Sequence, residues 1–241
     1  SILTTDSEFY SFDRQINRLA EEHMAKVDKV PTQPFCDFEK RFIEKITSNN
    51  YDLIFLSQVF FNSGVVVKNL KKIIESVKDT KTMIVIDGYH GFMAVPTDLS
   101  EIEDKIFYIA GSYKYAQGGE GCCFMVSPKK SLQRPLNTGW FAGFNHLESD
   151  GGNTGYSNDG FRFAGSTMDF SALYRLQAVL LLFKSEGLTV EKIHLHIQQL
   201  QKNFLKHLST VDHKILNEKN ILRSYFNHHG HFFAFSLPSP E

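Results

Sequence analysis

Three side chains in the middle of the sequence could act together on a ligand. Asp87 ends the apolar run TMIVID, His90 follows it, and Lys114 lies in GSYKYAQGGEG, directly after the run KIFYIAG. A lysine held among apolar and aromatic groups has a lowered pKa, and its free amine can form a Schiff base. Taken singly, an exposed loop lysine and a turn-capping aspartate are the ordinary roles. Their occurrence in this order favours an amine nucleophile beside a carboxylate.

The elements that must position these residues follow from the apolar runs. Strands are expected in SILTT, DLIFLS, TMIVID, KIFYIAG and GCCFMVS, and helices over residues 9–19, in DFEKRFIEKITS with Asp37 as N-cap, and in VKNLKKIIESV. This alternation predicts an α/β fold, a three-layer αβα arrangement around a mostly parallel sheet. Ligands bind such sheets at the carboxyl ends of the strands. Ser57, Asp87 and the Lys114 loop all fall there.

The second half of the chain has a different character. Residues 131–165 are rich in Gly, Asn and aromatic residues without a helix or strand period, and a connection of this length is often functional. Helices are expected from about 169 to 186, ending before Gly187, and from Thr189 to about 208. The run HFFAFSLP alternates like a half-buried strand. We expect a major domain over residues 1–210 and the beginning of a smaller C-terminal α+β domain over 211–241.

Composition excludes several classes of function. The 241 residues carry a net charge of −1 with no basic or acidic run, so neither nucleic acid nor a membrane is an expected partner. The longest apolar run, AVLLLF, is too short to span a bilayer. Three cysteines favour a reducing, cytoplasmic compartment, and Cys122 and Cys123 are expected in the core. No metal site is expected, because HHGH (228–231) has no acidic or cysteine partner nearby.

Pyridoxal phosphate is a ligand that would use both the acid and the amine. A carboxylate against its ring nitrogen keeps that nitrogen protonated, so that the ring withdraws electrons from the substrate carbon. Asp87 could provide the carboxylate, and Lys114 could provide the amine for a Schiff base. We therefore expect a pyridoxal 5'-phosphate site at the ends of these strands.

The motifs resemble a known family at this point. IDGYHG followed by GSYKYAQGGEG is similar to the class V aminotransferase group of fold-type-I pyridoxal-phosphate enzymes, especially kynureninase and its relatives. LSQVFFNSG, TGWF and FRFAGST resemble further segments of that family, in the same order. The resemblance covers roughly residues 2–208. Single motifs are weak signals, but five in the right order are fairly specific.

The resemblance implies a role for each matching residue. Lys114 would carry the cofactor as a Schiff base and then move protons, and Asp87 would pair with the pyridine nitrogen. His90 would lie near the phenolic oxygen and Tyr113 would bind the phosphate. The other implied cofactor contacts are Ser57 near the ring or phosphate, Phe9 stacked on the ring, and Trp140, Ser166 and Thr167, which would reach the cofactor of a partner subunit. A homodimer with shared active sites is thus implied.

The sequence also departs from the family pattern. The glycine-rich turn that holds the phosphate and the arginine that grips the substrate carboxylate are not found, and both are expected in parts of a longer chain. Arg162 is the only arginine near the site motifs. It could partly replace the missing arginine, but a structural salt bridge is its expected role. GGEG (118–121) does not open a helix and is expected to turn the backbone behind Lys114.

Several functions stay open on this basis. The leading one is an aminotransferase of class V acting on a small-molecule amino acid, and the alternative within the family is a kynureninase-like hydrolase that cleaves a carbon–carbon bond. Cysteine desulfuration fits poorly, because no cysteine follows Cys123. The alternative of another class is a non-catalytic α/β domain that binds a nucleotide or a partner. The sequence does not identify the amino acid.

Overall fold

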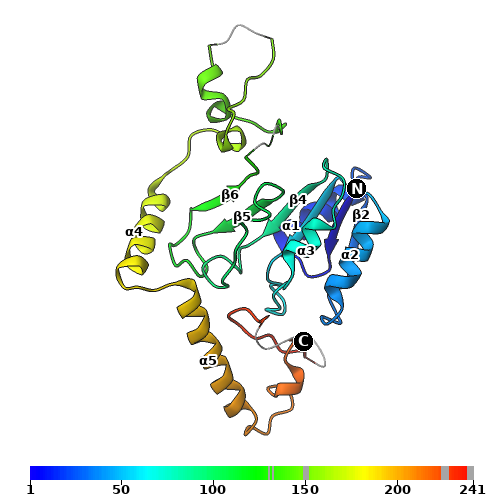
Figure 1. Cartoon of the computed structure of the whole chain (residues 1–241), viewed down its shortest axis with the longest axis vertical. Coiled ribbons are helices and arrows are strands. Elements are labelled where there is room, and N and C mark those ends of the chain that lie inside the picture. Colours follow the sequence, from blue (N-terminus) through cyan, green and yellow to red (C-terminus); the bar gives the residue numbers. More distant parts are fainter. Residues whose placement is uncertain (130, 132, 149–151, 224–227, 238–241) are drawn as a thin grey trace.

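A six-stranded sheet forms the centre of the molecule. The computed structural model describes residues 1–129, 131, 133–148, 152–223 and 228–237 (Figure 1). The strand order is β2-β1-β3-β4-β5-β6. All pairs are parallel except that of β5 with β6. The strands are β1 (Ile2–Thr5), β2 (Val27–Val30), β3 (Leu53–Ser57), β4 (Met83–Asp87), β5 (Phe107–Gly111) and β6 (Cys123–Val126). The predicted α/β class is confirmed.

Helices cover both faces of this sheet. Ile54 and Leu56 of β3 pack in one core cluster with α2 (Phe38–Ser48) and α3 (Leu70–Glu75). Phe55 points to the opposite face, where its ring stacks on Phe12 of α1 (Tyr10–Glu21) at a centroid distance of 3.5 Å. Successive strand residues alternate between faces, so a strand that is apolar at every position needs a helix layer on each side. The apolar runs in the sequence therefore predict helices on both faces of the sheet.

Two expectations about strands need correction. β2, with the sequence VDKV, was missed because it is a half-exposed edge strand with charged residues at its centre. The expected strand in HFFAFSLP does not form within residues 231–237, and Pro238 lies outside the described residues. Residues 228–235 instead make single bridges, Val65 to His229 and Ile221 to Phe235. This segment pairs with loops rather than with the sheet, and side-chain alternation alone could not reveal that.

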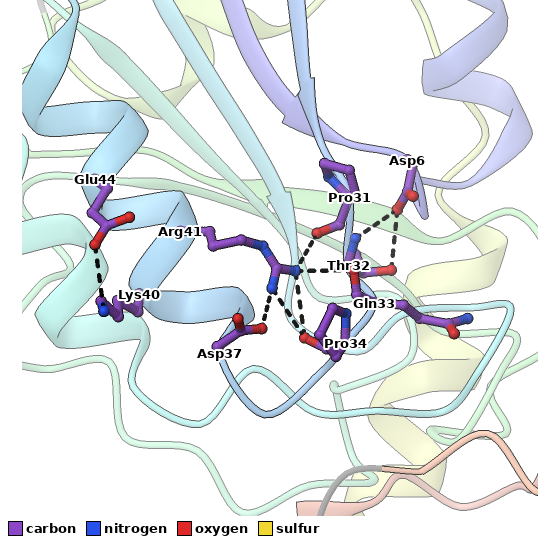
Figure 2. Close-up of polar contacts among 9 residues, drawn as sticks. All are labelled: Asp6, Pro31, Thr32, Gln33, Pro34, Asp37, Lys40, Arg41 and Glu44. Carbon is purple, nitrogen blue, oxygen red and sulfur yellow. Dashed lines mark hydrogen bonds and ion pairs between the residues drawn. The ribbon is translucent and has the colours of Figure 1, made fainter.

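The turn that follows β2 is held by side chains of neighbouring elements (Figure 2). Arg41 of α2 donates to the backbone oxygens of Pro31 (2.7 Å) and Gln33 (3.2 Å). Asp37 occupies the N-cap position as expected, but its side chain makes no capping hydrogen bond and pairs with Arg41. Asp6, just after β1, accepts from the backbone N–H of Thr32 (2.9 Å). The turns after β1 and β2 are therefore fixed to each other.

The second half of the chain extends away from the sheet. The long segment 131–165 contains two short 3₁₀ helices, η1 (Trp140–His146) and η2 (Gly160–Phe163), and it projects beyond β6 in Figure 1. Its residues 132 and 149–151 are outside the described part. The expected helices are confirmed as α4 (Ser171–Ser185) and α5 (Val190–Leu208), and a short η3 (Glu218–Asn220) follows. Gly187 has φ +62° after α4, and the Thr189 side chain caps α5.

Candidate active site

The loop that carries Lys114 is closed by its own hydrogen bonds. The Ser112 hydroxyl donates to the Gly119 oxygen at 2.7 Å, and its backbone N–H donates to the Cys122 oxygen at 2.8 Å. Gly119 and Gly121 have φ values of +72° and +95°, which glycine adopts without strain. The glycine cluster thus turns the chain sharply, as expected. It presents Lys114 at the carboxyl end of β5.

Aromatic rings and one imidazole surround the Lys114 amine. Nζ lies 2.9 Å from His90 Nε2 and 3.2 Å from its Nδ1. The ring centroids of Phe9, Tyr89 and Tyr113 are 5.3, 5.7 and 6.0 Å from Nζ. Burial lowers the pKa of Lys114, and the negative field of Asp87 only partly opposes this. A neutral, nucleophilic amine is therefore more accessible here than on an exposed lysine.

His90 is a neutral hydrogen-bond acceptor at physiological pH. Burial, with a smaller contribution from the Lys114 charge, lowers the pKa of His90 to about 4. A neutral imidazole carries one N–H and one bare nitrogen, so its bare nitrogen can accept a hydrogen bond from the lysine amine. Its ring also lies 5.6 Å from the ring of Phe232. The structure thus brings His90 and Lys114 into contact.

Asp87 has two distinct oxygens. Oδ1 accepts from the backbone N–H of Tyr89 at 2.9 Å, so the residue does cap its turn. Oδ2 has no hydrogen bond and no ion pair within the described residues. Burial raises the pKa of Asp87, while the Tyr89 N–H and the Lys114 charge lower it. A cation placed against Oδ2 would offset the cost of keeping this carboxylate charged.

Glu8 is a site residue that the sequence analysis missed. It is 4% exposed and lies three residues after the end of β1, and its carboxylate accepts from the Ser57 hydroxyl at 2.5 Å and from the Thr5 hydroxyl at 2.7 Å. Ser57, the partner of Glu8, pairs in register with Asp87. Glu8 and Asp87 therefore both lie at the carboxyl ends of the parallel strands. Burial raises the pKa of Glu8 to about 7. Asp87 is the last residue of its strand, whereas Glu8 follows β1 by three residues, so the pattern that singled out Asp87 did not extend to Glu8.

Three residues that were expected to contact the cofactor lie away from Lys114 in this chain: Trp140, Ser166 and Thr167. Trp140 and the segment of Ser166 and Thr167 are neighbours, joined by a hydrogen bond of 3.2 Å from the Phe141 N–H to the Gly165 oxygen. Trp140 is 43% exposed, and both hydroxyl residues are exposed. η2 packs on the first residue of β5, the amino end of that strand, through a contact between Phe163 and Phe107 of 5.6 Å. Lys114 follows the opposite end.

Other expectations about single residues are corrected. Arg162 forms no salt bridge in the described part of the chain, because its buried guanidinium donates to the backbone oxygens of Ser157 (2.9 and 3.0 Å) and Ser131 (2.5 Å). It holds residues 131–162 together. Cys122 is buried as expected, but Cys123 is exposed.

The sequence predicts neither a metal site nor a membrane-spanning segment. His229 binds the Phe232 oxygen (2.8 Å), whereas His231 pairs with His194 (3.1 Å), so the HHGH histidines have separate partners. No group of three potential metal ligands occurs in the described part of the chain. Among the helices of that part, none is long and apolar enough to cross a membrane.

Comparison with known proteins decides the family. The sequence profile described as Aminotransferase class-V matches residues 1–231. The chain belongs to the class V aminotransferase family. This confirms the resemblance seen in the sequence, and with the family comes its cofactor, pyridoxal phosphate. Among curated proteins none matches the sequence significantly.

Solved structures of class V enzymes share the fold. A lysine-to-alanine variant of the cystine C–S lyase C-DES, with glycine covalently linked to pyridoxal phosphate, is 20% identical with a TM-score of 0.79 over 99% of this chain and 61% of its own. An apo cysteine desulfurase from Thermococcus onnurineus NA1 is 17% identical (TM-score 0.76; 99% and 57% covered). The ureidoglycine–glyoxylate aminotransferase of Bacillus subtilis is 15% identical (TM-score 0.62; 90% and 55%). The chain thus spans about 60% of the length of the first of these enzymes.

The residues at the sheet edge fit the cofactor of the class V family. The Lys114 amine, with its lowered pKa, suits an aldehyde, and the unpaired Asp87 oxygen suits a pyridinium nitrogen. The Tyr113 hydroxyl forms no hydrogen bond within the described part of the chain and suits a phosphate oxygen. Phe9 provides an aromatic face near the amine.

Proposed function

We propose that the protein is a pyridoxal-phosphate-dependent enzyme that transaminates an amino acid, with Lys114 as the residue that binds the cofactor. One observation carries the proposal. The Lys114 amine, with a lowered pKa, lies 2.9 Å from neutral His90, at the carboxyl ends of the strands, where half-buried Asp87 has no ion pair in the described residues. The cofactor, when bound, supplies an electron-withdrawing ring for chemistry at the substrate α-carbon.

The protein side chains have separate tasks in this account. The Lys114 amine holds the cofactor, and it then takes a proton from the substrate α-carbon and returns it at another atom. Asp87 keeps a proton on the ring nitrogen by charge pairing. His90 is neutral and accepts a hydrogen bond from the amine, which orients the amine without placing a second positive charge beside it. Tyr113 would bind the phosphate and Phe9 would cover the ring.

We further infer that the enzyme is a cytoplasmic homodimer with shared sites. Trp140, Ser166 and Thr167 lie together and exposed, at the other end of the sheet from Lys114. The segment that carries them is supported by buried Arg162, so it is a built surface rather than a loose loop. Thr167 precedes α4, whose N-terminus favours an anion such as a phosphate. The division into domains 1–210 and 211–241 belongs to the same proposal.

A kynureninase-like hydrolase is the second candidate. The ring of Phe232 lies beside His90, and with Phe9 and Tyr89 it makes the surroundings of the amine largely aromatic. Such surroundings favour a substrate with a flat, apolar side chain, because aromatic groups pack well on one another.

A spectral screen of the full-length protein tests the proposal and separates the candidates. The purified protein is loaded with pyridoxal phosphate and titrated with single amino acids, while the visible absorbance and the products are followed. Transamination predicts a keto acid in an amount equal to the aminated cofactor, whereas carbon–carbon cleavage predicts released alanine. Release of sulfide from cysteine would contradict both candidates and indicate a C–S lyase activity instead. A protein that takes up no cofactor contradicts the proposal and supports a non-catalytic binding domain.

A further inference from the structure

The turn between β1 and α1 is fixed from both sides. On the β2 side, Asp6 accepts from the Thr32 N–H (2.9 Å) and hydroxyl (3.0 Å), as Figure 2 shows. The Ser7 hydroxyl lies 2.7 Å from that of Thr32. On the β3 side, Glu8 accepts from Ser57. Because β1 lies between β2 and β3, these contacts join the carboxyl ends of three neighbouring strands.

Every hydrogen bond that Glu8 makes within the described part of the chain is one that its side chain accepts, and the charge of Asp87 also acts on it. Its two oxygens accept from the Thr5 hydroxyl (2.7 Å), the Ser57 hydroxyl (2.5 Å) and the Ser57 backbone N–H (3.1 Å). A carboxylate can accept all of these, whereas an amide would turn an NH₂ group toward one of the donors. Hydrogen bonds to charged groups are also stronger than those between neutral groups. The surroundings therefore select an acid at this position rather than any residue of similar size.

The residue after Glu8 faces the Lys114 amine. Phe9 is the N-cap residue of α1, and its ring packs edge-on against Phe61 at a centroid distance of 5.4 Å. The same ring centroid is 5.3 Å from Lys114 Nζ. Any shift of the turn at Glu8 must move the first residue of α1 and with it this ring.

We propose that Glu8 is a positioning residue of the active site: by fixing the turn before α1 to the end of β3, its carboxylate holds the Phe9 ring against the Lys114 amine. Glu8 is buried, and its partner Ser57 pairs in register with Asp87. The hydrogen bonds between Glu8 and Ser57 therefore lie beside the candidate active site. The inference rests on the proposed function only in taking Lys114 as the residue that binds the cofactor.

Glu39 provides a matched control. Its carboxylate also joins two elements by accepting backbone N–H groups, those of Lys68 (2.7 Å) and Asn69 (3.1 Å). It belongs to α2, and within the described part of the chain it makes no hydrogen bond or ion pair with Phe9 or Lys114. A purely structural role for Glu8 would make the two glutamates equivalent at the site.

The test uses full-length protein with Glu8→Gln, Phe9→Leu, both changes together, and Glu39→Gln. The dissociation constant of pyridoxal phosphate is measured by visible absorbance. Glu8→Gln and Phe9→Leu should each weaken binding by about 10-fold, the scale of one charge-assisted hydrogen bond. The double variant should bind about as weakly as Phe9→Leu, because Glu8 acts through Phe9. A roughly 100-fold additive loss, or no loss with Glu8→Gln, would overturn the proposal.

A second readout needs no cofactor. With para-fluorophenylalanine at position 9, the fluorine resonance of the apo protein should shift or broaden in Glu8→Gln and stay unchanged in Glu39→Gln. An unchanged resonance in Glu8→Gln also overturns the proposal. If even the unaltered protein binds no cofactor, the proposed function fails while the fluorine signal still decides the role of Glu8. Should Glu8→Gln not fold, Glu8→Asp, which shortens the same carboxylate by one methylene, takes its place with the same expected results.

Discussion

The Nζ atom of Lys114 lies 2.9 Å from Nε2 of His90, and burial favours the neutral form of both groups. Around neutral pH the imidazole carries no charge, and its bare nitrogen accepts a hydrogen bond from the amine. Asp87, at the end of the adjacent strand β4, opposes the loss of a proton from the amine. The charge state of this carboxylate is therefore the first property to test.

Asp87→Asn should keep the fold and lower turnover by about 10²-fold or more, the scale of a lost catalytic charge or acid–base group. The Asn side-chain oxygen can still accept from the Tyr89 N–H, but an amide cannot hold a proton on the ring nitrogen. Turnover and the unfolding temperature of the full-length enzyme would both be measured. Asp98→Asn is the control, because Asp98 caps an exposed turn in the same way through the Ser100 N–H (2.9 Å). Equal turnover in the two variants would mean that Asp87 only caps its turn.

Glu8 should make stability depend on pH. Its pKa is about 7 in the folded state against an ordinary 4.5, so its contribution to folding is fully present below pH 4.5 and is lost as the pH rises through 7. A shift of this size corresponds to about 3 kcal/mol. The charged group that faces it is Asp87, whose raised pKa has the same sign.

Denaturant unfolding of the unaltered protein and of Glu8→Gln from pH 5 to 8 measures this contribution. The Gln variant should lose less stability across this window, since its side chain has no proton to lose. Contributions from His90 and other groups are common to both proteins and cancel in the difference. Two parallel stability curves would show that Glu8 titrates at its ordinary pKa.

Gly88→Ala should lower the stability of the folded protein by disturbing the turn after Asp87. A Cβ atom at Gly88 would lie 2.0 Å from the ring of Tyr108, whose hydroxyl donates to Gln58 at 3.1 Å. Relief requires a shift of the ring or of the turn after Asp87, with a cost of about 1–3 kcal/mol. Gly152→Ala is the control, because its Cβ would meet nothing within 4 Å. Thermal unfolding of the two variants side by side checks this, and equal midpoints would contradict it.

Much of the candidate site could be predicted because the sequence patterns that indicate it are local. Asp87 and Lys114 each follow an apolar run that can only be a buried strand, and Gly119 and Gly121 permit the sharp turn of the loop after Lys114. Glu8 could not be assigned in this way, since its partner Ser57 is 49 residues further along the chain. Arg162 also has a distant partner, Ser131, which lies 31 residues away in the sequence. Tertiary partners of polar residues leave no periodic pattern.

Shared sites predict that two inactive variants rescue each other. Full-length Lys114→Ala has intact Ser166 and Thr167, whereas the variant with Ser166→Ala and Thr167→Ala has an intact Lys114. Random exchange makes half of the dimers mixed, each with one of two sites restored, so about a quarter of the normal activity should return. Subunit exchange is confirmed by native mass spectrometry. Exchange without recovered activity would show that each site is built within one chain.

The central claim is that Lys114 binds the cofactor. The full-length protein, loaded with pyridoxal phosphate, is treated with borohydride and digested, and the peptides are analysed by mass spectrometry. The account predicts a reduced pyridoxyl group on the peptide that contains Lys114, and no such adduct together with a turnover loss of at least about 10²-fold in Lys114→Ala. An adduct on another lysine, or a Lys114→Ala variant with near-normal turnover, would contradict it.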